Sequence, residues 1–130
     1  MANEKQIYTE TFKAGDDYSS KQYYGCKLEA NRQVALPGAD TAIPAGIILN
    51  KPADGEAALV LVVGRAPGVV AEPITAGQLI RIDQYGKVAL FEPATDTTCY
   101  CCGQCLVGAG SGSEAQVGEF MYNFANPWKP

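Results

Sequence analysis

The sequence predicts an all-β fold, a small single-domain β-barrel or sandwich with an extended N-terminal arm and a short C-terminal tail. No stretch of the chain repeats its apolar residues with the 3.6-residue period of an amphipathic helix. Glycine (14 residues) and proline (8 residues) interrupt the 130-residue chain about every eight to twelve residues, which is typical of many short strands. We therefore expect residues 1–20 to form the arm, residues 21–124 the domain and residues 125–130 the tail.

The expected strands follow one another along the domain. Residues 22–28 alternate between apolar and polar side chains, which indicates a half-buried strand. Residues 57–63 are mostly leucine and valine and predict a strand that is buried on both faces. The sequence DQYG at residues 83–86 has the chemistry of a hairpin turn. Further short strands are expected at residues 33–36, 46–49, 69–71, 78–82, 87–91, 99–107 and 117–124.

Scattered apolar side chains mark the polar arm, and the single tryptophan lies in the tail. Such terminal segments often become ordered on a partner, and tryptophan is favoured at interface hot spots. We therefore predict that Ile7, Tyr8, Phe12 and Trp128 contact a binding partner. The alternatives are that the arm is an ordinary first strand and that Trp128 packs on its own domain.

Composition excludes several classes of function. The chain has no histidine, which removes histidine-based acid–base catalysis, Ser-His and Cys-His nucleophiles and histidine-containing metal sites. The net charge of −4 argues against a basic face for nucleic acid. The longest apolar run, residues 57–63, is far shorter than the roughly 20 residues of a membrane span, and no signal-peptide pattern opens the chain. We expect a soluble, non-enzymatic protein without a cofactor that binds neither nucleic acid nor membrane.

Four of the five cysteines fall within the sequence CYCCGQC, and Cys26 is distant from them. Cys99 and Cys102 have the spacing of a zinc knuckle, and Cys26 and Cys105 would complete a set of four thiolates. In a regular strand, however, Cys99, Cys101 and Cys105 would face one way and Cys102 the other. Three interpretations stay open: buried free thiols, a disulfide, or a metal site in a cysteine-rich metal-binding or redox β-module.

The middle of the chain resembles a family of phage proteins. The most specific part is the run GIILNKPADGEAA at residues 46–58, which follows the strand patterns of residues 22–36 and precedes the sequence ITAG at residues 74–77. Over residues 20–92 the chain is similar to the capsid decoration, or cement, proteins of tailed bacteriophages, also known as the DUF2190 type. The cysteine-rich strand, the polar arm and the Trp-Pro tail depart from that pattern.

The resemblance implies a structural protein of the virion. It implies a small β-barrel that is made in the cytoplasm of a bacterial host, binds the outside of the assembled head and stabilises the shell. The implied partners are the major capsid protein and further copies of the chain, in a homotrimer. Asn50, Lys51, Pro52 and Gly55 match the family's turn and Gly77 matches its strand entry. These residues are scaffold positions, and the resemblance implies no catalytic residue.

Overall fold

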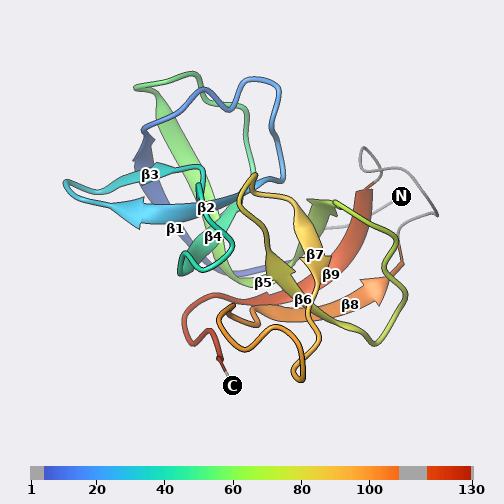
Figure 1. The fold of residues 1–130 in the computed structure, drawn as a ribbon. Coiled ribbons are helices and arrows are strands. Elements are labelled where there is room, and N and C mark those ends of the chain that lie inside the picture. The colour runs from blue at the N-terminus through green and yellow to red at the C-terminus, as the bar shows by residue number, and fades with distance from the viewer. Residues whose placement is uncertain (1–4, 109–116, 130) are drawn as a thin grey trace.

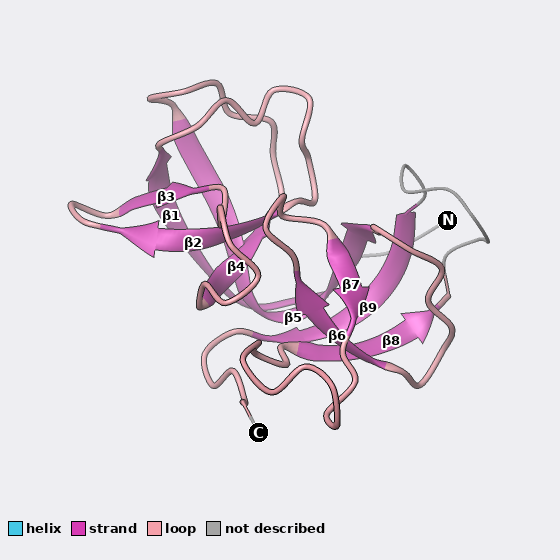
Figure 2. Cartoon of the chain, viewed as in Figure 1, coloured by secondary structure: helices cyan, strands magenta, loops and turns pink. Residues whose placement is uncertain are grey.

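The computed structural model describes residues 5–108 and 117–129, in which nine strands are joined by turns and loops (Figure 1). The described residues contain no helix (Figure 2), and so no helical membrane span. The expected all-β barrel fold is therefore confirmed. The strands are β1 (Lys5–Ala14), β2 (Gly25–Glu29), β3 (Gln33–Ala35), β4 (Pro44–Ile48), β5 (Ala57–Val69), β6 (Leu79–Ile82), β7 (Val88–Leu90), β8 (Gly103–Val107) and β9 (Val117–Asn123).

Five strands close a barrel in the order β1-β3-β2-β4-β5, because β1 pairs with β3 on one side and with β5 on the other. Closure removes the unpaired sheet edges that would otherwise invite association. The inward-facing side chains are small or β-branched, with one buried tyrosine, which suits the narrow interior of a five-stranded barrel. The buried members of this first core are Ala14, Tyr18, Cys26, Val34, Ile48, Ala58 and Val60.

The second half of β5 belongs to a second group of strands, β5-β9-β8-β6-β7. A single parallel bridge between Val70 and Val88 links β7 back toward the end of β5. In Figure 1, β1 to β4 lie on one side of β5 and β6 to β9 on the other. A larger core fills this half, and it includes Phe120 and Tyr122 of β9 and Phe124 immediately after that strand. The alternation at residues 117–124 predicted that these three rings share a face.

β5 continues beyond the predicted strand at residues 57–63, and it absorbs part of the separate strand expected at residues 69–71. Glycine and proline were expected to interrupt the strand. Instead they lie within β5, in the part of the strand that passes from the first core to the second. Gly64 has φ +145°, a backbone conformation that side chains disfavour. A Cβ at Gly68 would meet the hydroxyl of Tyr122, a methyl group of Val88 and the ring of Phe120. The expected hairpin at residues 78–91 is present as β6 and β7.

The segment expected to be an arm contributes a strand of the barrel wall. β1 pairs with β5 from Lys5 to Lys13, with register shifts around Tyr8. Farther along, Tyr18 is fully buried and donates its hydroxyl to the Gly25 carbonyl at 3.4 Å. The structure thus places residues 5–18 within the domain and not outside it, whereas residues 1–4 lie outside the described part. The pairing was hidden because β5 lies far along the sequence and strand pairing is non-local.

The turn that resembles the phage family joins β4 to β5. The Asn50 side chain donates to the Ala57 carbonyl and accepts from the Leu59 amide, both at 3.0 Å. Gly55 has φ +90° and donates to the Ala14 carbonyl at 2.8 Å, which ties the turn to the end of β1. The turn therefore holds the barrel closed at this end. Of the other family positions, Lys51 is exposed and Pro52 buried, and Gly77 has φ +91° before β6.

Replacing Asn50 with alanine is expected to lower the free energy of unfolding by about 1–3 kcal/mol, because two main-chain groups lose their side-chain partner. Urea unfolding followed by circular dichroism measures the change. Lys51→Ala, at the exposed neighbouring position, is the matched control and should change stability by less than about 0.5 kcal/mol. Equal effects of the two substitutions would show that the Asn50 bonds do not hold the turn.

Candidate functional site

Exposed apolar side chains gather where the two groups of strands meet. Here Arg65 of β5 pairs with Lys5 of β1 on one side and with Met121 of β9 on the other. Ile7, Leu106 and Met121 line an open hollow around Arg65. Their exposed fractions are 71%, 36% and 43%, which are high for such apolar side chains. We call this surface, formed by Ile7, Arg65, Leu106 and Met121, the seam face.

The seam face carries little net charge. Arg65 Nε lies 3.2 Å from Glu119 Oε1, and Glu119 is 7% exposed. The guanidinium is therefore balanced by a carboxylate of its own chain. Depletion of unpaired charge at the centre of an apolar surface is typical of protein–protein contact sites.

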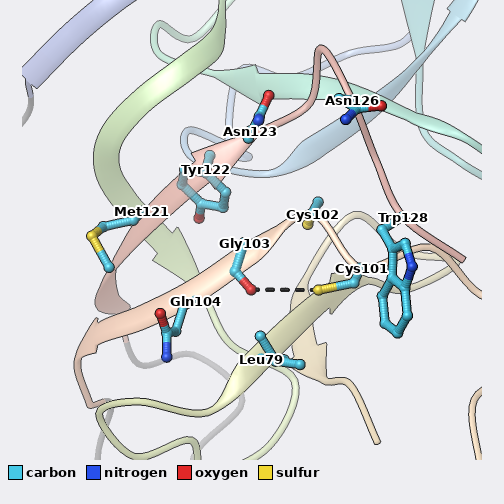
Figure 3. A pocket seen from close by; sticks show the side chains of 10 residues that line it. All are labelled: Leu79, Cys101, Cys102, Gly103, Gln104, Met121, Tyr122, Asn123, Asn126 and Trp128. Carbon is cyan, nitrogen blue, oxygen red and sulfur yellow. Dashed lines mark hydrogen bonds between the residues drawn. The ribbon is translucent and has the colours of Figure 1, made fainter. Parts of the chain in front are cut away.

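A second hollow lies beside the seam face and shares Met121 with it (Figure 3). Its lining includes Trp128, Asn126 and Gln104. Figure 3 shows the Trp128 ring beside Cys101, whose thiol donates to the Gly103 carbonyl at 3.6 Å. The two hollows form one surface, which runs from Ile7 through Met121 to Trp128. Two of the four side chains predicted to contact a partner therefore lie at its two ends.

The other two predicted contact residues, Tyr8 and Phe12, lie elsewhere on β1. Tyr8 donates its hydroxyl to Glu10 at 2.7 Å and is 47% exposed. Phe12 is half-buried against the first core, and the Arg32 guanidinium carbon lies 5.2 Å from its ring centroid. The structure therefore brings Ile7 and Trp128 to the same surface and keeps Phe12 with the barrel interior.

Sequence reasoning missed Leu106 and Met121. The alternation in β9 directs Phe120 and Tyr122 inward, so that Met121 between them points outward. A methionine on the outer face of a strand was therefore a usable signal. Its grouping with Ile7 follows from the pairing of β1 and β9 with the same stretch of β5, which the sequence does not reveal.

The cysteines do not assemble into the four-thiolate set considered from sequence. Cys26 belongs to the first core, whereas Cys102 and Cys105 belong to the second. All five are free thiols, and within the described ranges no three cysteine, aspartate or glutamate side chains are placed to hold a metal ion. The expected alternation of faces is wrong, because β8 begins only at Gly103, and Cys102 and Cys105 are both buried while Cys101 is half-buried.

Burial makes several titratable groups hard to ionise. Burial raises the pKa of Cys26 to about 12, although the bond to the Gly46 carbonyl partly opposes this. Burial likewise raises the pKa of Cys102 and Cys105 above the ordinary value for a thiol. It also raises the pKa of the Tyr18 and Tyr122 hydroxyls. These groups act as apolar core side chains at neutral pH, in contrast to the lowered pKa of reactive cysteines.

The free energy of unfolding is expected to be steady near neutral pH and to fall above about pH 9. In the unfolded chain the buried thiols and phenols ionise near their ordinary pKa values, whereas in the folded chain they stay protonated. The unfolded state therefore binds fewer protons, and stability is lost as pH rises. Urea unfolding at pH 7.5, 9 and 10 measures the decline, and Cys26→Ala should make it shallower. A free energy that stays level to pH 10 would contradict this account.

Comparison with known proteins bears on the fold. No protein-family model and no curated protein matches the sequence. Among solved structures, the chain is similar to the head fiber gp8.5 N base in bacteriophage phi29, with a TM-score of 0.63. The similarity covers 90% of this chain and 94% of that chain, at 12% sequence identity. The two chains therefore share a fold along nearly their whole lengths.

Proposed function

We propose that this chain is a structural protein of a tailed-bacteriophage head, a decoration or cement protein that binds the outside of the assembled capsid and stabilises the shell. The observation that carries the proposal is the similarity of fold to the base of a phage head fiber over 90% of the chain. The decoration or cement role is taken from the resemblance of the sequence motifs in residues 20–92, although no protein-family model matches the chain. Because fold alone does not specify function, the mechanism of binding must be argued from the exposed side chains of the seam face.

The seam face supplies a means of binding. Ile7, Leu106 and Met121 offer apolar area that is already exposed, and the Arg65–Glu119 pair leaves no unbalanced charge to desolvate. The partner proposed for this face is the major capsid protein. Because the chain has no histidine and burial raises the pKa of the Cys26 and Cys102 thiols, it is proposed to act by binding and not by catalysis.

Stabilisation of the shell follows from linkage. A protein that binds only the assembled capsid shifts the equilibrium toward that state by mass action. Association of three copies into a homotrimer would multiply weak contacts through a high effective concentration. Nucleic acid and membranes are not proposed partners, since the chain carries a net charge of −4.

Co-sedimentation with purified heads tests the proposal. Heads of the phage that encodes this chain, prepared without it, are mixed with increasing amounts of the pure protein and pelleted. We expect saturable binding at a fixed ratio to the major capsid protein, and a higher temperature of DNA release from the decorated heads. Unassembled capsid protein is the matched control and should bind weakly. Absence of the chain from the pellet at saturating concentration would overturn the proposal.

A further inference from the structure

Two further hollows, each of about 440 Å³, adjoin one another at Tyr24. Their volumes are within the range of ligand pockets. One hollow extends to Val69 and Val117, which pair at the end of the β5–β9 ladder, and the other extends to the turn between β6 and β7. Neither hollow is lined by a residue of the seam face. We call their shared surface the tyrosine–lysine face, which is formed by Lys21, Tyr23, Tyr24, Lys51, Tyr85 and Lys87.

Main-chain bonds and packing hold two of the tyrosines in place. Tyr23 has φ +68°, which is uncommon for a residue with a side chain. Its amide donates to the Ile48 carbonyl at 2.8 Å, and the Ile48 amide donates to the Tyr24 carbonyl at 2.9 Å. The Tyr23 side chain packs on the second core and that of Tyr24 on the first. Two consecutive rings are thus fixed, one against each core, so a partner that binds them would cost them little side-chain freedom.

A well-defined turn presents Tyr85 and Lys87. Asp83 Oδ1 accepts from the amides of both residues, at 2.9 Å each. The Tyr85 side chain is 62% exposed, which is high for a large aromatic residue. Tyrosine is enriched at protein contact sites because its ring supplies a large, rigid area and its hydroxyl can bond a partner. The three tyrosines of this face therefore suit contact with another protein.

The lysines give the face a positive charge, although the whole chain carries a net charge of −4. No aspartate or glutamate is among the described residues that line the two hollows. Within the described ranges Lys21 and Lys51 form no ion pair, whereas each of the three arginines pairs with a carboxylate. Bonds from Ser19 lower the pKa of the exposed Asp17, and the charge of Lys21 adds to this effect. The face therefore carries lysine charge that no carboxylate within its lining neutralises.

We propose that the tyrosine–lysine face binds an acidic, extended segment of a second protein. Its lysines pair with carboxylates of that segment, and the two hollows take apolar side chains that lie between them. A dense polyanion such as nucleic acid is disfavoured, because none of the described lining residues is an arginine for phosphate recognition and the net charge of −4 repels it. The inference goes beyond the proposed function, because it involves neither the seam face nor binding to heads.

Fluorescence anisotropy with a labelled peptide tests the proposal on the pure, full-length chain. The probe has the sequence GEELEELG, which presents carboxylates and a leucine on each face when extended. We expect saturable binding that weakens at least about threefold between about 50 and about 200 mM salt, because salt screens exposed charges. Peptides GQQLQQLG and GKKLKKLG are the matched controls and should bind at least about tenfold more weakly. Equal binding of the glutamine peptide would overturn the proposal.

Substitutions at exposed positions locate the binding site. Lys51→Glu is expected to weaken peptide binding about fivefold and Tyr85→Ala about tenfold, whereas Tyr85→Phe retains the ring and should bind within about twofold of the wild type. Both side chains are exposed, so the variants should unfold at the wild-type temperature. Lys13→Glu is the same charge change at an exposed position of β1 outside the hollows. Equal losses for Lys13→Glu and Lys51→Glu would overturn the proposal, because binding would then follow net charge alone.

Competition identifies the class of ligand. Oligodeoxythymidylate and polygalacturonate, at equal concentration of negative charge, should displace the labelled peptide at least about tenfold less well than unlabelled GEELEELG does. Equal or better displacement by either polymer would overturn the peptide as ligand, in favour of nucleic acid or an acidic polysaccharide. Light scattering of the wild type and of Lys51→Glu is expected to give equal masses. A lower mass for Lys51→Glu would also overturn the proposal, because the face would then join copies of this chain.

Discussion

Replacing Met121 with aspartate is expected to weaken binding to phage heads by about 30-fold, or about 2 kcal/mol, without unfolding the protein. Met121 lines both hollows and is 43% exposed, so its side chain is free to enter an interface. A carboxylate at the centre of a desolvated contact has no partner there, because Arg65 is already paired with Glu119. The affinity is measured by quantitative co-sedimentation.

Leu28→Asp is the matched control for this prediction. Leu28 is an exposed apolar residue, 58% accessible, on β2 of the five-stranded barrel, away from the seam face. The same change of chemistry at this site should leave head binding unaltered, and both variants should unfold at the wild-type temperature. If the Met121→Asp variant bound heads with wild-type affinity, the seam face would not be the binding surface. An equal loss for both variants would indicate a general charge effect.

Replacing Gly46 with alanine is expected to lower the free energy of unfolding by about 3 kcal/mol and the melting temperature by about 10 °C. Gly46 lies in β4 opposite Cys26. A Cβ there would overlap a methyl group of Val60 and lie 2.6 Å from the Leu61 carbonyl oxygen. The carbonyl belongs to β5, the strand shared by both halves, so it cannot move without disturbing both. Calorimetry measures the change.

Gly38→Ala separates crowding from backbone strain. Gly38 has φ +76° but no atom within 4 Å of an added Cβ. Its substitution should cost only about 1 kcal/mol, the usual penalty for a side chain at positive φ. A Gly46→Ala protein as stable as Gly38→Ala would contradict the close approach of β4 to β5.

Local patterns predicted the parts of the fold that depend on local physics. The turn chemistry of residues 83–86 specified the β6–β7 hairpin, since Asp83 Oδ1 accepts from the Tyr85 and Lys87 amides at 2.9 Å each. The alternation around Phe120 likewise specified the inner face of β9. These features need only neighbouring residues, so they can be read from sequence.

Non-local pairing explains what the sequence did not reveal. β1 resembled a loosely ordered arm because its partner β5 begins more than forty residues later. Gly64 and Pro67 resembled strand breaks because their role, to carry β5 between two cores, exists only in the folded sheet. The seam face was hidden for the same reason: Ile7, Leu106 and Met121 come from three strands and meet only through β5 and its neighbours.

The composition of the virion tests the central claim most directly. Particles of the phage that encodes this chain are purified by density-gradient centrifugation, and their proteins are quantified by mass spectrometry. The account predicts many copies of the chain in each particle, at a constant ratio to the major capsid protein, and their retention after the tail is removed. Finding the chain only in the soluble lysate, with none in purified heads, would contradict its assignment as a structural protein of the phage head.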